Sequence, residues 1–301
     1  MKWLKRGLLI EPPVHLPWVT SHAAVPHVHE SDGSLEVYFT TRDDRRRSHI
    51  AAARVDLDGG RVEVASDPVL VPGPLGAFDD SGVMTSCLVR NGDQSYLYYQ
   101  GWSLGVTVPF YVFGGCAISE HAGAQFERVS PAPVLGRHAV DPYMCSSPWV
   151  LQDDDRWRMW YVSNLGWRPQ EVGDPQYMVH IKYAESTDGL AWERDGHVCI
   201  DFAAPGEYAI SRPCVLKDED LFRMWYSYRG GAYRIGYAES HDGLHWRRRD
   251  DEAGIDVSPD GWDAEMVEYA CVFDHGGSRH MLYNGNGYGE TGIGHAVLSE
   301  A

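Results

Sequence analysis

Several signals are missing from the amino-acid sequence, and each absence excludes a class of protein. No stretch approaches the roughly 20 consecutive apolar residues that a membrane-spanning helix needs, so no membrane span is predicted. The apolar run near the N-terminus is too short for the hydrophobic region of a signal peptide, and we therefore expect a cytoplasmic protein. Helix-type periodicity is scarce, whereas glycine (32) and proline (17) are frequent. This combination is typical of an all-β chain.

Positive charge is also scarce. The chain of 301 residues has 26 Lys and Arg against 43 Asp and Glu, a formal net charge of −17, and its basic blocks, such as Arg45-Arg46-Arg47, are short. A nucleic-acid backbone repels so acidic a chain, so nucleic-acid binding is not expected.

Motifs for metals and cofactors are missing as well. The six cysteines form no Cys-x-x-Cys pair, and we expect reduced, buried thiols. His27 and His29 share one strand face without a cysteine nearby, so no metal site is predicted. There is no Gly-x-Gly-x-x-Gly motif and no Gly-x-Ser-x-Gly motif, and we expect no cofactor. A calcium ion on the central axis is compatible with the sequence but is not indicated by it.

What the chain does contain is a segment that occurs twice. His180-Ile-Lys-Tyr-Ala-Glu-Ser-Thr-Asp-Gly-Leu-Ala-Trp-Glu-Arg194 matches Arg234-Ile-Gly-Tyr-Ala-Glu-Ser-His-Asp-Gly-Leu-His-Trp-Arg-Arg248, and Arg-Met-Trp-Tyr precedes each copy. Weaker copies lie on both sides, which makes five units that fill the chain. We predict one domain over residues 1–301, an all-β fold in the form of a five-bladed β-propeller. A β-sandwich is the alternative, but it does not explain the ordered recurrence.

The shared Ser-x-Asp-Gly-x-x-Trp ending is interpreted as a structural turn, because Asp-Gly favours tight turns and Asp side chains bond nearby amides. The site is sought instead on the first strand of each unit, which lines the axis of a propeller. We align these strands on Val28, Leu88, Val150, Val215 and Val272. Side-chain alternation then predicts that four residues face one funnel at the channel mouth: His22, Asp80, Glu207 and Glu268.

Paired carboxylates of this kind serve glycosidic chemistry, in which one acid donates a proton and the other activates water or attacks carbon. We therefore predict these four residues as catalytic candidates. The alternative is that the acids only cap strands or bind backbone amides. The predicted substrate-binding residues lie at strand ends and in nearby loops: Arg42, Asp43, Asp79, Trp102, Asp141, Trp167, Arg212, Tyr228, Arg229 and Glu265. Arginines hold carboxylates or phosphates, and aromatic rings stack on sugars.

The five units, the Ala-Glu-Ser-x-Asp-Gly-x-x-Trp ending and the aromatic second strands resemble the five-bladed propeller glycosidases. These include glycoside hydrolase families 43, 32, 62, 68, 117 and 130. The chain also resembles uncharacterised propeller proteins encoded with surface-glycan biosynthesis genes. In family 43 the resemblance implies an Asp base, an Asp that tunes a pKa and a Glu acid from the first three blades. This sequence departs from that pattern, because it offers His22 in the first blade and no clear Glu in the third.

The resemblance to family 130 implies phosphate-binding basic residues beside one acid, and His22, Arg42, Arg212 and Arg229 keep that possibility open. We expect a carbohydrate-active enzyme whose partner is a small sugar, with hydrolysis, phosphorolysis and transfer left open. The gathering of arginines at the mouth favours a phosphorylated, nucleotide-linked or carboxylated sugar. A carbohydrate-binding protein without catalysis and an enzyme of other chemistry on the same scaffold are the alternatives.

Overall fold

The computed structural model describes residues 1–31, 33–120, 125–153 and 156–299. In this part of the chain nearly all regular structure is β-strand, and helix is limited to two short 3-10 segments, η1 (Asp250–Glu252) and η2 (Asn286–Gly289). None of the helical segments described is long and apolar enough to span a membrane. The prediction of an all-β chain is confirmed.

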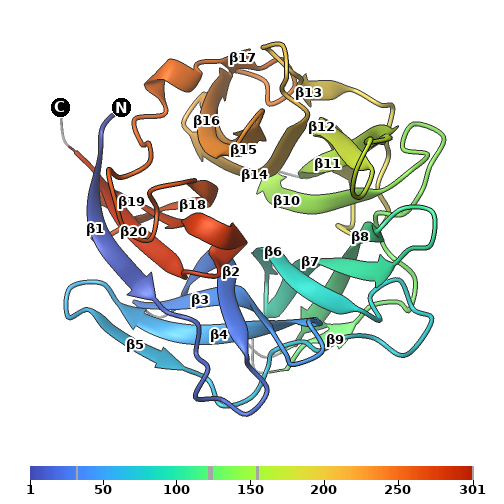
Figure 1. Cartoon of the computed structure of the whole chain (residues 1–301). Helices are drawn as coiled ribbons and strands as arrows, with labels where there is room; N and C mark the ends of the chain where they lie inside the picture. The colour runs from blue at the N-terminus through green and yellow to red at the C-terminus, as the bar shows by residue number, and fades with distance from the viewer. Residues whose placement is uncertain (32, 121–124, 154–155, 300–301) are drawn as a thin grey trace.

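Figure 1 shows the strands arranged around a central axis, with the two chain ends near each other. The strands are β1 (Trp3–Ile10), β2 (Ser21–Ser31), β3 (Ser34–Arg42), β4 (Ser48–Asp56), β5 (Arg61–Val64), β6 (Gly82–Asn91), β7 (Gln94–Leu104), β8 (Phe110–Ser119), β9 (Glu127–Arg128), β10 (Cys145–Asp153), β11 (Arg156–Arg168), β12 (Gln176–Ser186), β13 (Val198–Ile200), β14 (Ala209–Asp218), β15 (Leu221–Arg229), β16 (Tyr233–Ser240), β17 (Arg247–Arg248), β18 (Glu268–His275), β19 (Ser278–Asn284) and β20 (Ile293–Leu298).

Hydrogen bonding divides the described strands into antiparallel groups of four. Four groups follow the chain, as β2–β5, β6–β9, β10–β13 and β14–β17, and the last combines β18–β20 with β1. Because β1 pairs with β20, the first strand of the chain is the fourth strand of the group that β18, β19 and β20 form. Short parallel bridges, such as Ser48 with Gly82, join some neighbouring groups.

The first strands of the groups, β2, β6, β10, β14 and β18, contact one another in cyclic order around the axis. One side chain on each first strand bonds the backbone of the next first strand. The bonds of this ring are Leu88 N to His27 Nε2 (3.0 Å), Val150 N to Cys87 Sγ (3.2 Å), Trp149 Nε1 to Val215 O (2.9 Å), Val272 N to Cys214 Sγ (3.2 Å) and Val28 N to Cys271 Sγ (3.4 Å). All six cysteines are free and buried, as predicted.

The Ser-x-Asp-Gly-x-x-Trp segment forms a turn that fastens one group to another. The Asp188 carboxylate accepts hydrogen bonds of 2.8 Å from the amides of Leu190 and Ala191, and Gly189 has the positive φ that glycine favours. The Tyr98 hydroxyl of the preceding group donates to the Gly189 carbonyl at 2.7 Å. The structural interpretation of this motif is confirmed.

Candidate active site at the channel mouth

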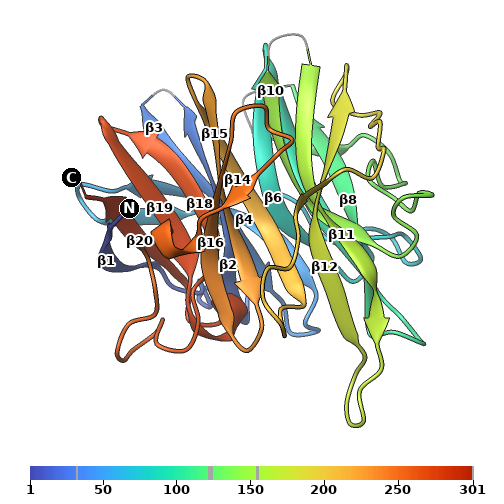
Figure 2. The same cartoon turned by 90° about the horizontal axis from the view of Figure 1, so that it is seen from above.

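The first strands of the groups all begin at one end of the molecule, which we call the mouth. At this end the second strand of each group finishes, as the pairing of Ser21 with Arg42 and of Gly82 with Trp102 shows. The hairpin between β11 and β12 projects beyond the other loops at the mouth (Figure 2). Loops and strand ends therefore surround the point where the first strands converge.

A cavity of about 150 Å³ lies at the mouth between these first strands. We call it the mouth cavity. Its wall combines hydroxyl groups, aromatic rings and aliphatic side chains with one guanidinium, and no carboxylate belongs to the lining. The lining residues are Val25, Met84, Gln100, Phe110, Val112, Met144, Ser146, Ser147, Val162, Tyr177, Val179, Ser211, Arg212, Tyr233 and Tyr269.

A repeated irregularity decides which side chains reach this cavity. In β2, β10, β14 and β18 the pairing shifts, so that two residues oppose one on the neighbouring strand, as in a β-bulge. The first of the two residues has a left-handed backbone in each strand, which costs about 1–2 kcal/mol for a side chain other than glycine. These residues are Val25 (φ 53°), Ser147 (φ 47°), Arg212 (φ 52°) and Tyr269 (φ 56°), and all four line the mouth cavity.

Arg212 lies deeper than the rim position that the sequence predicted for it. Its side chain is buried, with an exposure of 1%. Nη1 donates to the carbonyl oxygen of Ser86 at 2.6 Å, and Nη2 donates to that of Pro26 at 3.0 Å. Because these bonds run from β14 to both β6 and β2, the guanidinium crosses the axis at the inner end of the cavity.

Glu268 is the first residue of β18 and is fully buried, with an exposure of 0%. Neither of its carboxylate oxygens forms a hydrogen bond of normal geometry among the described residues, although the Tyr269 hydroxyl lies close enough to affect its pKa. Burial raises the pKa of Glu268 well above its ordinary value, although the Tyr269 hydroxyl and the Arg229 charge act in the opposite direction. Burial also raises the pKa of Tyr269 and Tyr233 in the cavity wall. Glu268 is thus a buried acid behind the cavity wall, and its burial favours the protonated form.

His22 is the second residue of β2 and lies at the mouth. Its Nδ1 lies 2.8 Å from the Ser21 hydroxyl, and its backbone is left-handed, with φ 66°. Burial and the charge of Arg42 lower the pKa of His22 to about 4, while Glu290 acts to raise it. The imidazole is therefore neutral at pH 7 and can accept a proton.

Arg229 ends β15 and lies among tyrosine rings. Its guanidinium is 5.5 Å from the ring centre of Tyr208, 5.3 Å from that of Tyr233 and 5.7 Å from that of Tyr288. It also donates a hydrogen bond of 2.7 Å to the Tyr288 hydroxyl, and Tyr288 is exposed. Together with Tyr177 and Tyr269, these residues give the mouth an aromatic wall suited to sugar rings.

Two predicted binding acids, Asp79 and Asp141, are buried in internal networks. Asp79 accepts from the Tyr99 hydroxyl at 3.1 Å and from Arg128 at 2.8 Å. Asp141 accepts from Tyr161, Ser163, Lys182 and Arg194 at 2.6–3.2 Å. Burial opposes the ionisation of Asp141, but the Ser163 hydrogen bond and the Lys182 charge lead the effects that lower its pKa overall. We interpret both acids as structural.

Glu207 and Asp43 are engaged in a similar way. Both oxygens of Glu207 accept from Arg248, at 2.9 and 3.2 Å, and one also accepts from the Ala203 amide. Asp43 binds the Arg47 amide at 2.8 Å and lies 3.1 Å from His49. These partners turn the two carboxylates toward loops of their own groups.

The remaining predicted residues are distributed around the mouth. Asp80 accepts from the Gly76 amide at 3.0 Å and from the Ser81 hydroxyl at 2.9 Å. Glu265 is exposed. The other three are aromatic: Trp102 donates to the Ser48 hydroxyl at 2.7 Å, Tyr228 packs under Arg248, and Trp167 contacts Phe110 and Tyr177 of the cavity wall.

Sequence reasoning missed Tyr177, Tyr208, Tyr233, Tyr269 and Glu290. Tyr208 and Tyr269 directly follow two predicted acids, and this adjacency is the one signal that pointed toward them. Tyr177 and Tyr233 open third strands, where the sequence pattern indicates only core residues. Glu290 follows η2, whose position over β2 no local pattern reveals.

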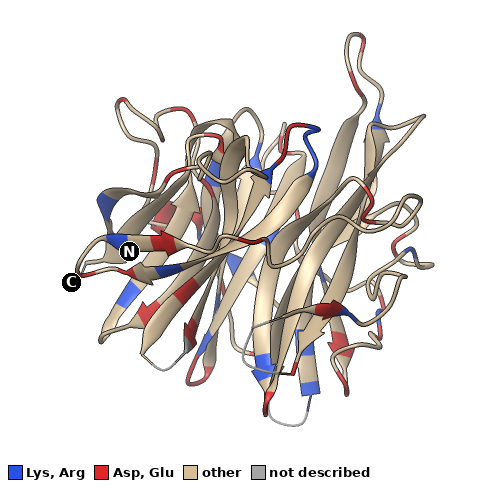
Figure 3. Ribbon diagram, turned by 90° about the horizontal axis from the view of Figure 1, so that it is seen from below, with Lys and Arg blue, Asp and Glu red and all other residues tan. Residues whose placement is uncertain are grey.

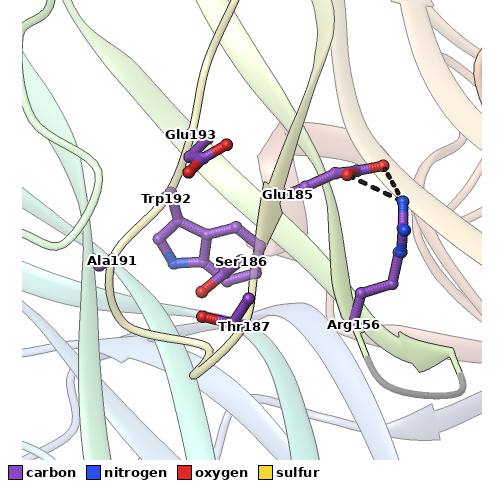
Figure 4. A pocket seen from close by; sticks show the side chains of 7 residues that line it. All are labelled: Arg156, Glu185, Ser186, Thr187, Ala191, Trp192 and Glu193. Atoms are coloured by element: carbon purple, nitrogen blue, oxygen red, sulfur yellow. Dashed lines mark hydrogen bonds and ion pairs between the residues drawn. The ribbon is translucent and has the colours of Figure 1, made fainter.

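Other hollows lie far from the mouth. One is lined by Arg156, Glu185, Trp192 and their neighbours, at the end of β12 opposite to the mouth (Figure 4). There Arg156 is ion-paired with Glu185 at 3.1 Å. Figure 3 shows charges of both signs along loops and strand ends, with the strands largely uncharged. The described residues contain no cluster of three or more His, Cys, Asp or Glu side chains that could hold a metal ion.

No protein-family model matches the sequence. Two proteins of Mycobacterium tuberculosis, Uncharacterized protein MT1551 of strain CDC 1551 / Oshkosh and Uncharacterized protein Rv1502 of strain ATCC 25618 / H37Rv, are each 48% identical to this chain over 301 residues. The matches cover 99% of this chain and 99% of each relative.

Solved structures share the fold at lower identity. A thermostable family-43 glycoside hydrolase matches with a TM-score of 0.71 at 15% identity, covering 97% of this chain and 94% of that one. The β-1,2-mannobiose phosphorylase from Listeria innocua, in complex with β-1,2-mannobiose, matches with a TM-score of 0.72 at 15% identity, also covering 97% and 94%. The chain shares the fold of these glycoside hydrolase and phosphorylase structures, as the sequence motifs predicted. This protein belongs to the family of the M. tuberculosis proteins MT1551 and Rv1502.

Proposed function

We propose that the chain is a single-domain, five-bladed β-propeller and a glycosidase-like enzyme that acts on a small sugar at the mouth. The blades are the antiparallel groups of four strands, and the ring of bonds between first strands supports their radial order. The observation that carries the catalytic part is Glu268, a fully buried acid without an ion-pair partner among the described residues, beside a cavity walled by tyrosines.

In this proposal the protonated Glu268 is the general acid. It gives its proton to the leaving oxygen as the bond between that oxygen and the anomeric carbon breaks. The oxygen of water or of phosphate forms the new bond to carbon. Where water attacks, the neutral His22 takes up its proton.

The lining of the mouth cavity favours an external nucleophile over a second protein carboxylate. A retaining glycosidase needs two carboxyl groups about 5 Å apart, and an inverting one needs them within about 10 Å. Glu268 lies directly behind the lining residue Tyr269, whereas no second carboxylate is among the described residues that line the cavity, and Glu207 is held by Arg248. Hydrolysis assisted by His22, phosphorolysis and transfer to another acceptor fit this arrangement better than double displacement.

The substrate we propose is a small sugar that carries a phosphate, a nucleotide or a carboxylate. Arg42, Arg229 and Arg212 supply positive charge at the rim and in the cavity, and the tyrosine wall supplies stacking surfaces. The relatives in the superfamily support a carbohydrate as the partner: the phosphorylase structure holds β-1,2-mannobiose. A cytoplasmic location stays a prediction.

A screen of nitrophenyl glycosides and sugar phosphates, with and without inorganic phosphate, tests this function. Turnover only with phosphate identifies phosphorolysis, and turnover without it identifies hydrolysis. Glu268→Gln keeps the shape of the acid but has no proton to donate, so it should abolish turnover while leaving sugar binding within about threefold. Asp80→Asn tests another of the three predicted acids in the same assay, and we expect it to retain activity because the Asp80 carboxylate accepts hydrogen bonds from Gly76 and Ser81.

A carbohydrate-binding protein without catalysis is the second candidate. It is favoured by the absence of a carboxylate from the lining residues that the structure describes. Sugar binding that Glu268→Gln leaves unchanged, together with no turnover of any screened glycoside by the native chain, would select this alternative.

A further inference from the structure

The mouth cavity is closed at its inner end by Arg212. Its guanidinium binds the carbonyl oxygens of Pro26 and Ser86. Pro26 lies one residue farther from the mouth than the lining residue Val25, and Ser86 lies two residues farther than the lining residue Met84. The hydroxyl of Ser86 in turn donates to the Pro148 carbonyl at 2.6 Å, which ties a third first strand to the same point. The cavity is therefore a blind pocket with a cation at its base.

The charge of Arg212 has no carboxylate partner among the described residues. The guanidinium contacts two backbone carbonyls, the Ser86 hydroxyl at 3.2 Å and the ring of Trp149 at 5.8 Å. Its Nε is buried without a hydrogen-bond partner in the described part of the chain. A buried guanidinium without a carboxylate partner is costly, and an anion placed nearby would offset that cost.

A second unpartnered group lies beside Arg212 in the lining. The Ser211 hydroxyl is buried and forms no hydrogen bond within the part of the chain that the structure describes. Ser146 and Ser147 add two hydroxyls from β10, of which Ser147 bonds Gln100 at 2.8 Å. Arg212 and Ser147 hold left-handed backbones, and such strain is concentrated at ligand sites. Hydroxyl and guanidinium donors around a small pocket are the groups that bind oxyanions.

We propose that the mouth cavity binds an oxyanion, a phosphate or a carboxylate, with Arg212 beneath it and the Ser211 hydroxyl beside it. The volume of about 150 Å³ is about five times the share of one liquid water molecule, enough for such a group and too small for a nucleoside diphosphate. The oxyanion is either free phosphate or a substituent of the sugar.

The orientation of the ligand in this inference rests on the proposed function. A sugar that carries the anion enters with its charged group first, and its glycosidic bond then lies toward the rim, where His22 and Glu268 are placed at the starts of β2 and β18. A nucleotide, where one is present, remains outside the cavity, near Arg229 and Tyr288.

Isothermal titration of the full chain tests the oxyanion site without requiring turnover. The probes are inorganic phosphate, glucuronate and glucose 6-phosphate, with glucose as the neutral reference. Tighter binding of inorganic phosphate than of glucose identifies a site for the free ion. Tighter binding of glucuronate or glucose 6-phosphate, without binding of phosphate alone, identifies a charged sugar. If all three anions bind no better than glucose, the proposal is overturned.

Ser211→Ala is the informative variant, because its hydroxyl forms no hydrogen bond to the described residues and its loss should leave folding intact. We expect it to weaken binding of the preferred anion about tenfold, as the loss of a hydrogen bond to a charged group does, and to leave glucose binding unchanged. Thr41→Val is the matched control, since the Thr41 hydroxyl is also buried and unpartnered among the described residues but does not line the cavity. Equal affinity in native chain and Ser211→Ala would contradict the assignment of Ser211.

Arg212→Met removes the charge and is used only where circular dichroism shows a folded chain. The two proposals remain separable. Anion binding without turnover of any glycoside supports the oxyanion site and contradicts the proposed enzymatic activity. Turnover of neutral glycosides without anion binding supports the enzymatic activity and contradicts the oxyanion site.

Discussion

The Tyr161 hydroxyl donates a hydrogen bond of 2.9 Å to the carboxylate of Asp141, twenty residues earlier in the chain. The same pair recurs at the same spacing as Asp79 with Tyr99 and Asp263 with Tyr283. In each case a cation from the last strands of the group, or from β1, binds the same carboxylate: Arg128 for Asp79, Lys182 and Arg194 for Asp141, and Lys5 for Asp263. Each of these carboxylates therefore connects its own loop to the second strand and to the outer strands of its group.

Asp141→Ala should therefore destabilise the fold strongly. The substitution leaves two buried cations, Lys182 and Arg194, without their counter-charge, and breaking a buried pair in this way costs about 3–5 kcal/mol. Urea unfolding measures the loss. Asp260→Ala removes an exposed carboxylate and should stay within about 0.5 kcal/mol of the native chain. A small loss at Asp141 with a large loss of sugar binding would instead support its predicted role as a ligand-binding residue.

The ring of bonds between first strands predicts a cost for one thiol. Cys214→Ala removes the acceptor of the Val272 amide and leaves that buried donor unpaired, at a cost of about 1–3 kcal/mol beyond the loss of the sulfur itself. Cys116→Ala removes a buried thiol whose contact with a neighbouring carbonyl is long, at 4.0 Å. Thermal unfolding should give a lower melting temperature for Cys214→Ala than for Cys116→Ala. Equal melting temperatures would show that the Val272 amide finds another partner.

The ring of bonds between first strands also shows how much of this fold the sequence predicts. The alignment on Val28, Leu88, Val150, Val215 and Val272 depends on apolar residues and a column of small neighbours. These are the residues whose backbone groups take part in the ring bonds, so the alignment is confirmed in register. Repeated strands carry this information because each first strand packs against its neighbours around the same axis.

The site was harder to predict because alternation fails at a bulge. Counting back by twos from Val272 reaches Glu268 and treats Tyr269 as facing away, yet Tyr269 lines the cavity from a left-handed backbone. Counting back from Val215 reaches Glu207, which pairs with Arg248 from a later strand. A bulge depends on contacts between strands, and no local pattern in one strand reveals it.

Glu268 predicts a pH dependence of stability. Its pKa in the folded chain lies above the ordinary value of 4.5, so the folded state keeps a proton that the unfolded state releases. The stability contributed by this group is fully present below pH 4.5 and is lost as the pH rises toward the folded pKa, by about 1.4 kcal/mol per pH unit. Glu268→Gln should remove this part of the slope.

The measurement is urea unfolding of the native chain and the variant at pH values from about 4.5, the ordinary glutamate pKa, upward to about 8.5. Buried histidines such as His22 and His295, whose pKa values are lowered to about 4, are present in both chains, so their contribution cancels in the comparison. Glu265→Gln alters an exposed glutamate nearby and should reproduce the native slope. Identical slopes for native chain and Glu268→Gln would mean that Glu268 is ionised in the folded state.

The last prediction concerns His22 as the proton acceptor of the proposed reaction. Burial, followed by the charge of Arg42, lowers the pKa of its imidazole to about 4, and Glu290 acts to raise it. Arg42→Gln should therefore move the pKa of His22 upward and Glu290→Gln should move it downward, which NMR titration of the imidazole measures directly. His29, whose pKa is lowered to about 4 by burial, His27 and Arg90, should not move in either variant. If His22 is the base, the acid limb of kcat/KM follows the same two shifts, because the protonated imidazole cannot accept a proton. An acid limb that stays in place while the NMR titration moves would assign proton uptake to another group.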